Sequence, residues 1–297
     1  MSGPDYAWPV PLYNLQGPPD ALVAPVLVVA FDGWVDAAGA ATTAVGHIST
    51  EGETIATFDS DLLYDYRSRR PVLDIVDGTL AELSWYELVI RLAHAGGRDV
   101  LALSGPEPDF RWKELGLDVM DLCLRLGVVE WISVGAIPAA VPHTRAVPVL
   151  GTASKPGLLP EDVTQGPQGL LRVPAAALSV VELSVTGAGI PAVGFFAQVP
   201  HYVGGPYAPA TIALVEHLGR HLGVDFPLRS LPDEAAAQRQ RIDAAVGADE
   251  DARAYLQRLE AMPAGEEGIP SGDELASEIE RFLRGEAGEE PGPFGGR

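Results

Sequence analysis

Titratable residues follow each of four short apolar segments of the chain. The apolar segments span residues 26–31, 100–104, 131–136 and 192–199. The candidates for chemistry that follow them are Asp32, Glu107, His143, Arg145 and His201. A carboxylate, an imidazole and a guanidinium held together can transfer protons or hold an anion. These residue types therefore permit acid–base catalysis, provided that the fold brings them to one place.

The apolar segments are typical of the elements that would position such a group. Runs of this length, apolar on both faces, indicate buried strands of a parallel sheet. The intervening patterns predict helices over residues 36–48, 114–126, 175–186 and 207–222. Strands that alternate with helices predict a three-layer α/β/α domain, in which ligands bind beyond the carboxyl ends of the strands. We therefore expect the five candidates to share one rim with Asp36, the expected N-cap of the first helix.

The same rim residues have a second interpretation. Ion-pair networks resemble active sites, so these groups could instead satisfy one another and the backbone in sharp turns. The chain contains no phosphate-binding loop and no His-Glu-x-x-His zinc motif, because Leu218 follows His217. One cysteine, Cys123, excludes a multi-cysteine metal site, and its apolar neighbours predict a buried thiol. We expect no metal and no cofactor.

The remaining segments complete the predicted organisation. Asp77-Gly78 between two apolar runs predicts a hairpin over residues 72–88, so the sheet should be mixed but mostly parallel. The Pro- and Gly-rich residues 1–25 predict an irregular arm on the domain. We expect an α/β domain over residues 1–231, an acidic helical appendage over 232–284 and a disordered tail over 285–297. The appendage should hold three helices, at 232–246, 249–261 and 271–283.

Composition narrows the classes of partner. The 297 residues carry 41 acidic against 20 basic side chains, a net charge of −21, which argues against binding to nucleic acid or an anionic membrane. Hydrophobic residues make up 47%, which is sufficient for a packed core. The chain shows neither a signal peptide nor an apolar run near the ~20 residues that cross a bilayer. We expect a cytoplasmic protein.

Five segments, taken in order, resemble the proteasome-assembly-chaperone family, most closely its actinobacterial branch. They are Phe31-Asp32-Gly33-Trp34-Val35-Asp36-Ala37, residues 59–71 with Asp65-Tyr66-Arg67 and Arg70-Pro71, Ser104-Gly105-Pro106-Glu107-Pro108-Asp109-Phe110-Arg111-Trp112, Pro142-His143-Thr144-Arg145, and Val199-Pro200-His201-Tyr202. The resemblance covers roughly residues 20 to 285. It implies a phosphorylase/hydrolase-like α/β fold, a small helical carboxyl-terminal part and homo-oligomers, with a trimer favoured.

The resemblance also implies a function. Eukaryotic relatives assist assembly of the proteasome α ring without catalysis, so the first hypothesis is a non-catalytic, oligomeric binding or scaffold protein with a protein partner. Its candidate binding residues are Trp34, Asp36, Arg111, Trp112 and Tyr202. The alternative is a hydrolase or phosphorylase of a small anionic or nucleoside-like molecule, with His143 or His201 as acid or base, Arg145 as anion clamp, and Asp32 or Glu107 as orienting carboxylate.

Two features depart from the family pattern. The family favours glycine two residues after the aspartate of the first motif, where this chain has Ala38, followed by Gly39. Relatives that dock on α rings can end in a hydrophobic-Tyr-x tail, whereas this chain ends Phe294-Gly295-Gly296-Arg297. Kinship of fold is therefore better supported than a shared partner.

Overall fold

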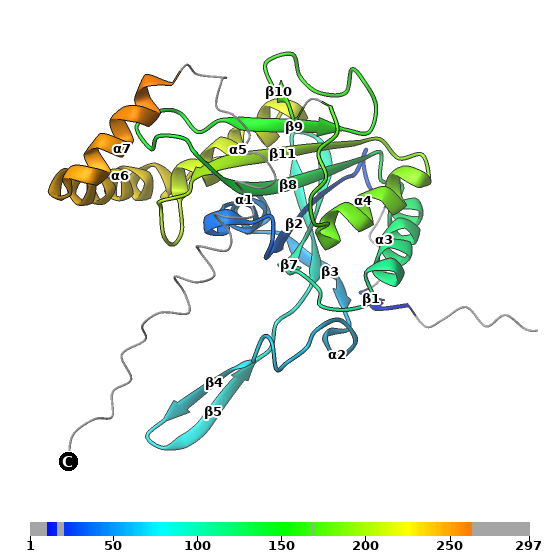
Figure 1. Ribbon diagram of the computed structural model, residues 1–297. Helices are drawn as coiled ribbons and strands as arrows, with labels where there is room; N and C mark the ends of the chain where they lie inside the picture. Colours follow the sequence, from blue (N-terminus) through cyan, green and yellow to red (C-terminus); the bar gives the residue numbers. More distant parts are fainter. Residues whose placement is uncertain (1–10, 17–20, 168, 263–297) are drawn as a thin grey trace, which may run out of the picture.

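Four parallel strands form the centre of the fold. The computed structural model describes residues 11–16, 21–167 and 169–262. The predicted apolar segments are the strands β2 (Val26–Asp32), β7 (Arg98–Pro106), β8 (Glu130–Ala139) and β11 (Ala192–Pro200). They are neighbours in the order β7-β2-β8-β11, and each adjacent pair is parallel (Figure 1). The predicted strands and their side-by-side arrangement are confirmed.

Further strands extend this sheet on both sides. In the described residues it has nine strands, in the order β1-β3-β6-β7-β2-β8-β11-β9-β10. The additional strands are β1 (Tyr13–Leu15), β3 (Glu53–Phe58), β6 (Val89–Ala95), β9 (Val149–Ala153) and β10 (Thr164–Gln165). Strands β1, β3 and β6 are antiparallel to their neighbours, as is β9 to β11, so the sheet is mixed around a parallel centre.

Helices cover both faces of the sheet, as predicted. One face carries α1 (Ala40–Ile48) and α5 (Ala208–Leu222), and the other carries α3 (Trp112–Leu126) and α4 (Ala177–Gly187). Along β2, Val26, Val28 and Ala30 pack under α1 and α5, while the alternate residues face α3 and α4. This period of two on a strand buried on both faces explains its continuous apolar sequence. The three-layer α/β/α fold is confirmed.

The helical appendage begins where the sequence predicted. Helix α6 (Leu231–Ala248) packs on α5, and α7 (Glu250–Ala261) follows after Asp249, whose side chain caps α7. The predicted third helix at 271–283 and the tail at 285–297 lie outside the described residues, as do residues 1–10 of the predicted arm. The division into domains at residue 231 stays a prediction.

Two local predictions need correction. The hairpin exists, as β4 (Val72–Val76) and β5 (Thr79–Ser84), but it forms a separate two-stranded sheet and ends at Ser84 rather than 88. The main sheet is mixed for another reason, the antiparallel strands at its flanks. The arm over residues 1–25 is not wholly irregular, because β1 pairs with β3 and buries Leu12.

Candidate functional site

The topology places the predicted rim residues at one edge of the sheet. Asp32 ends β2, and Glu107, His143 and His201 follow the carboxyl ends of β7, β8 and β11. These four strands are parallel neighbours, so the loops that follow them emerge on the same side. The contacts divide this edge into two clusters, which we call the carboxylate cluster (Asp32, Glu107 and Arg69) and the histidine cluster (His143, His201, Tyr202 and Arg145).

In the carboxylate cluster, both acids bind groups of the protein itself. Asp32 forms an ion pair with Arg69, at 2.7 Å between Oδ2 and Nη1. Glu107 accepts a hydrogen bond from the backbone N–H of Ala177, at 2.7 Å, at the start of α4. A carboxylate is favoured there by the partial positive charge of the helix N-terminus. A Cβ atom at Gly33 would lie 3.0 Å from Glu107 Oε2, so glycine permits this close approach.

In the histidine cluster, the imidazole of His143 is buried and has a partner at each nitrogen. Its Nδ1 lies 2.8 Å from the Tyr202 hydroxyl, and its Nε2 lies 3.0 Å from Asp243 of α6. The Tyr202 oxygen also accepts the backbone N–H of His143 at 2.7 Å. For a neutral imidazole, one assignment satisfies all three contacts: the hydroxyl donates to Nδ1, and Nε2–H donates to the Asp243 carboxylate.

Electrostatics agree with this arrangement. Burial raises the pKa of the Tyr202 hydroxyl, which keeps it protonated and able to donate. Desolvation opposes ionisation of Asp243, but hydrogen bonds from His143 and Arg239 outweigh it and lower the pKa of that carboxyl. Arg239, four residues earlier on α6, pairs with Asp243 at 2.9 Å and donates to the His143 carbonyl.

His201 has a similar setting beneath α7. Its Nδ1 lies 3.2 Å from the carbonyl of Ala139, and its Nε2 lies 3.3 Å from the hydroxyl of Tyr255 on α7. The rings of His201, Tyr202 and Tyr255 meet edge to face, at centroid distances of 5.5 to 6.4 Å. Such aromatic contacts add stability beyond the area that they bury. Tyr255 therefore packs on the body of the protein.

Arg145 and Thr144 hold the end of α7. The Arg145 guanidinium donates to the carbonyls of Glu260 and Met262, the latter at 2.9 Å. The Thr144 hydroxyl donates to the Glu260 carboxylate at 2.6 Å. Carbonyls in the last turn of a helix lack partners within the helix, and a cation satisfies them well. The sequence assigned Arg145 to an anion; in the structure it binds the carboxyl end of a helix.

Asp36 lies beside the central strands, where Ala136 of β8 forms a bridge to it. It is buried and accepts hydrogen bonds from the backbone N–H of Ala41, at 2.7 Å, and from the Thr42 hydroxyl. Burial raises its pKa, against these hydrogen bonds. Asp36 is the N-cap of a short 3₁₀ turn, Ala37–Gly39, and its carboxylate caps the first turn of α1 across that turn, while Gly39 is the N-cap residue of α1 itself.

The candidate binding residues differ in exposure. Trp34 is 46% exposed, and its backbone N–H lies 3.5 Å from Glu107 Oε2, whereas the Tyr202 hydroxyl contacts His143. Trp112 is partly buried and donates to the carbonyl of Pro108. Arg111 adopts a left-handed conformation, with φ of 59°, and pairs with Glu114. Trp34 is thus the most exposed of the candidate aromatic residues.

The sequence did not identify the partners that α6 and α7 contribute. Asp243, Tyr255 and Glu260 lie 54 to 116 residues from the rim residues that they contact. Arg239 and Asp243, four residues apart on one helix, were a detectable pair. Nothing in that spacing indicates which loop the pair meets.

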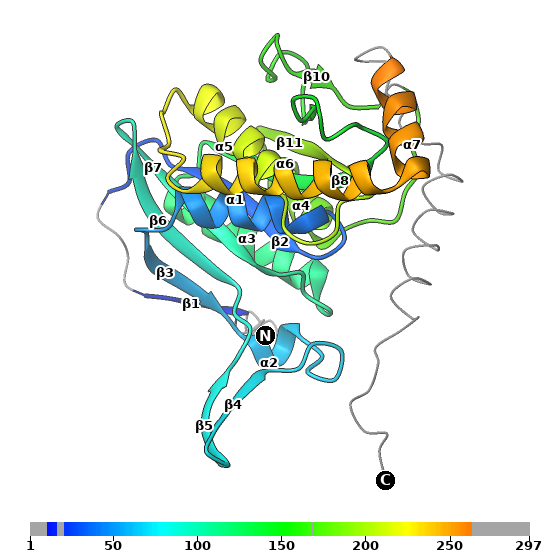
Figure 2. The same cartoon turned by 90° about the vertical axis from the view of Figure 1, so that its left-hand side faces the viewer.

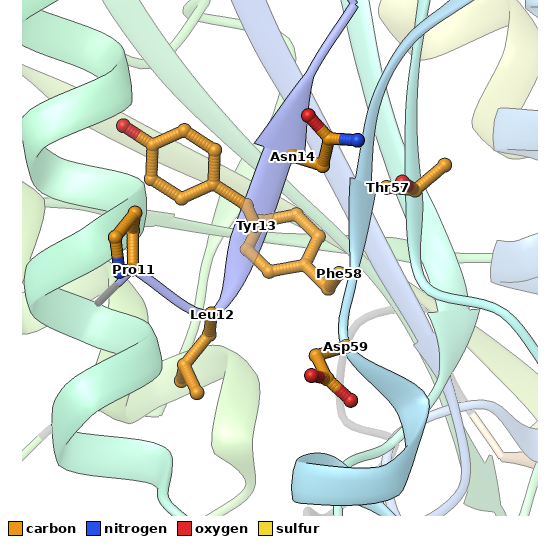
Figure 3. Close-up of a pocket in the computed structure, with 7 residues that line it drawn as sticks. All are labelled: Pro11, Leu12, Tyr13, Asn14, Thr57, Phe58 and Asp59. Carbon is orange, nitrogen blue, oxygen red and sulfur yellow. The ribbon is translucent and has the colours of Figure 1, made fainter.

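A shallow pocket lies elsewhere, at the edge of the sheet. It has a volume of about 310 Å³ between β1 and β3 and is lined by Pro11, Leu12, Tyr13, Asn14, Thr57, Phe58 and Asp59 (Figure 3). None of the predicted rim residues lines it. In the described residues, no group of three or more His, Cys, Asp and Glu side chains is arranged to hold a metal ion.

The fold and its rim define a class of three-layer α/β/α proteins with a helical appendage seated on the histidine cluster. Residues 30–246 match the model of the PAC2 family. The chain belongs to the PAC2 family. The match ends inside α6, so α7 lies beyond it.

Solved structures agree with this assignment. A proteasome-assembly chaperone homologue from Mycobacterium tuberculosis is 37% identical, with a TM-score of 0.71, over 78% of this chain and all of that one. A Streptomyces avermitilis PAC2 family protein is 34% identical, with a TM-score of 0.70, over 78% of this chain and 99% of that one. A second M. tuberculosis protein, of unknown function, is 31% identical, with a TM-score of 0.80, over 90% and 96%.

Neither the search of curated proteins nor the helices of the described residues gave a match. No protein of curated function matches the sequence significantly. Among the described residues, none of the helices combines the length and the apolar character that crossing a membrane requires.

The conformation of Ala38 gives a first testable prediction. Ala38 has φ of 58°, in the left-handed region that costs a non-glycine residue about 1–2 kcal/mol. Ala38→Gly should therefore raise the free energy of unfolding by about 0.5–1 kcal/mol, measured by urea denaturation, after the entropic cost of glycine. Ala37→Gly, one residue earlier and without positive φ, is the control and should destabilise. Equal destabilisation by both changes would contradict backbone strain at Ala38.

The contacts of Arg145 give a second prediction. Arg145→Ala removes the donors to the last carbonyls of α7, so α7 should open more often, with amide exchange faster by about tenfold. Hydrogen–deuterium exchange of peptides from α7 and from β8 measures the difference, and β8 should be unchanged. Arg220→Ala, which removes a guanidinium 3.6 Å from Asp162, is the matched control. Unchanged exchange in α7 would show that Arg145 does not hold it.

Proposed function

We propose that this chain is a non-catalytic, oligomeric binding or scaffold protein that acts in the cytoplasm on a protein partner. The observation that carries the proposal is that the rim side chains already bind other groups of the protein. Both nitrogens of His143 and of His201 contact groups of the protein, and Arg145 binds backbone carbonyls. A general acid or base needs a nitrogen within hydrogen-bond reach of a substrate. The histidine cluster is better suited to seating α6 and α7.

The relatives favour a component of the proteasome as the partner of this chain. The M. tuberculosis protein that is 37% identical is described as a proteasome-assembly chaperone homologue. Pyrococcus furiosus PbaB, an archaeal proteasome activator, is 13% identical with a TM-score of 0.60, which supports kinship of fold alone. We therefore propose an unassembled proteasome α-type subunit as the partner, and a homo-oligomer, with a trimer favoured, as the form that binds it.

An exposed aromatic residue supplies a surface for such a partner. Trp34 is 46% exposed. It follows the carboxyl end of β2. Tryptophan and other aromatic residues are enriched at the energetic centres of protein interfaces. We propose that this part of the rim contacts the partner.

One observation favours the alternative, a hydrolase or phosphorylase of a small anionic or nucleoside-like molecule. The carboxylate cluster does lie at the carboxyl edge of parallel strands, with the backbone N–H of Glu107 2.8 Å from the carbonyl of Asp32. That edge is where open α/β sheets bind ligands. Against it, Asp32 and Glu107 are held by Arg69 and by Ala177.

Binding to the partner tests the proposal. The purified full-length chain should bind an isolated α-type subunit from the same organism, measured by biolayer interferometry. Trp34→Ala should weaken binding by roughly 30-fold, because an aromatic anchor commonly contributes about 2 kcal/mol. Leu170→Ala, at a residue that is 86% exposed in the loop before α4, is the control and should leave binding unchanged.

Two results would argue against this function. One is the absence of binding to isolated or assembled α-type subunits. The other is turnover of nucleosides with phosphate, or of phosphate esters, that disappears in Glu107→Gln, since this change keeps the shape of the side chain and removes its charge.

A further inference from the structure

The hairpin formed by β4 and β5 stands apart from the rest of the protein. Both views show it projecting from the body, away from the helical layers (Figures 1 and 2). Every residue of both strands is exposed. Its turn, Asp77-Gly78, has φ of 50° and 77°, which matches the twist of a two-residue hairpin. The sequence therefore specifies the hairpin locally.

One face of this hairpin is apolar. Leu73 pairs with Leu83, and Ile75 pairs with Leu80, so these four side chains share a face. They are 45% to 69% exposed. A bulge between Asp74 and Ile75 shifts the register by one residue, which brings Leu80 onto the face of Leu83. The register thus places four large aliphatic side chains on one side, whereas Val72 and Val76 lie on the other side with Asp74.

The opposite face and the turn of the hairpin are acidic. Asp74 and Glu82 lie directly across from each other, and Asp77 is in the turn. Like charges in cross-strand pairs are destabilising. A two-stranded hairpin without a partner is itself marginal in water. Exposed apolar side chains on one face and paired acids on the other together indicate that another surface covers the hairpin.

The base of the hairpin presents a surface with complementary properties, which we call the hairpin seat: Leu62, Trp85 and Phe110, with Arg67 and Arg70. The three apolar side chains are 41% to 50% exposed. Trp85 packs edge to face on Tyr66, at 4.8 Å, and the backbone N–H of Phe110 binds the carbonyl of Leu63, next to Leu62. These contacts place the members of the seat around the root of the hairpin.

The charges of the seat are available for a partner. Arg67 and Arg70 are exposed, and neither forms an ion pair within the described part of the chain. They oppose the acids of the hairpin in sign. Asp61 and Asp65 lie in the same segment, but their carboxylates accept hydrogen bonds from the Tyr66 hydroxyl and from the backbone N–H of Arg67. The two guanidiniums are therefore left for acids of another surface.

We propose that the hairpin of one copy of this chain packs on the hairpin seat of a second copy. Its apolar face would cover Leu62, Trp85 and Phe110, and its acids would meet Arg67 and Arg70. The four aliphatic side chains of the hairpin present on the order of 400 Å². Together with the seat, the exposed area of each copy comes close to the ~800 Å² per partner that stable interfaces bury. Each copy gives one hairpin and receives another, so the contacts close a symmetric dimer or ring.

This inference rests on the proposed oligomeric function and names the surface that builds the oligomer. Sedimentation velocity of the full-length chain over a concentration series measures the mass and the dissociation constant. Ile75→Thr with Leu80→Thr keeps residues that favour strands and removes the apolar face. It should weaken self-association by roughly tenfold or more. Leu170→Thr, equally apolar and more exposed, is the control and should have no effect.

Charge reversal tests the pairing independently of hairpin folding. Arg67→Glu with Arg70→Glu should weaken self-association, because the acids of the hairpin would then meet acids. Adding Asp74→Arg with Glu82→Arg to the same chain should restore it, since the signs are again opposite. Circular dichroism and thermal melting verify that each variant keeps the fold.

The outcomes separate this inference from the proposed function. A wild-type oligomer that the hairpin changes do not weaken would overturn the hairpin contact and leave an oligomeric scaffold in place. A wild-type chain that stays monomeric at its highest soluble concentration would overturn both. Loss of association without rescue by the second charge reversal would show that the hairpin meets another surface, and would also overturn the proposed pairing.

Discussion

The parallel pairing of β2 between β7 and β8 is the constraint on which the rest of the structure depends. Val26 of β2 is aligned with Val100 on one side and Glu130 on the other, so three strands enter and leave the core together. With β11 alongside β8, four loops that are far apart in sequence emerge at one edge. The apolar character of these strands is thus the physical reason that the rim exists.

Polar groups that are buried at such an edge need hydrogen-bonding partners. A buried carboxylate or imidazole is unfavourable unless it is hydrogen-bonded. Here the start of α4 satisfies Glu107, and residues of α6 and α7 satisfy His143, His201 and Arg145. The appendage therefore supplies hydrogen-bonding partners to a rim that carries two imidazoles and a guanidinium.

The sequence predicted the central strands well because each is a short, continuous apolar segment, which few other elements produce. It predicted the hairpin because Asp77-Gly78 supplies two positive φ angles locally. It did not predict that the hairpin leaves the main sheet, since strand propensity does not specify the neighbour. Asp36 caps the predicted helix, but it does so across a short turn that the sequence did not predict, because two consecutive left-handed residues, Ala38 and Gly39, come before α1.

The sequence predicted where the rim lies, but it left two interpretations of what the rim residues do. Residue types at the ends of strands indicate where polar groups gather, and topology confirmed that edge. Whether they face a ligand or another helix depends on contacts such as Asp243 with His143, 100 residues apart, which no local pattern encodes. Both interpretations therefore remained possible from the sequence, and the engagement of both ring nitrogens favours the anchoring role that we propose.

That role is tested most directly by the protonation of His143. Long-range nitrogen–proton NMR of the full-length chain at neutral pH reports which ring nitrogen carries hydrogen and how fast that hydrogen exchanges with water. Anchoring to Asp243 predicts a single form with hydrogen on Nε2 and slow exchange, and loss of that signal in Asp243→Ala. A ring that exchanges rapidly between tautomers and with water, as an accessible catalytic imidazole would, contradicts the account.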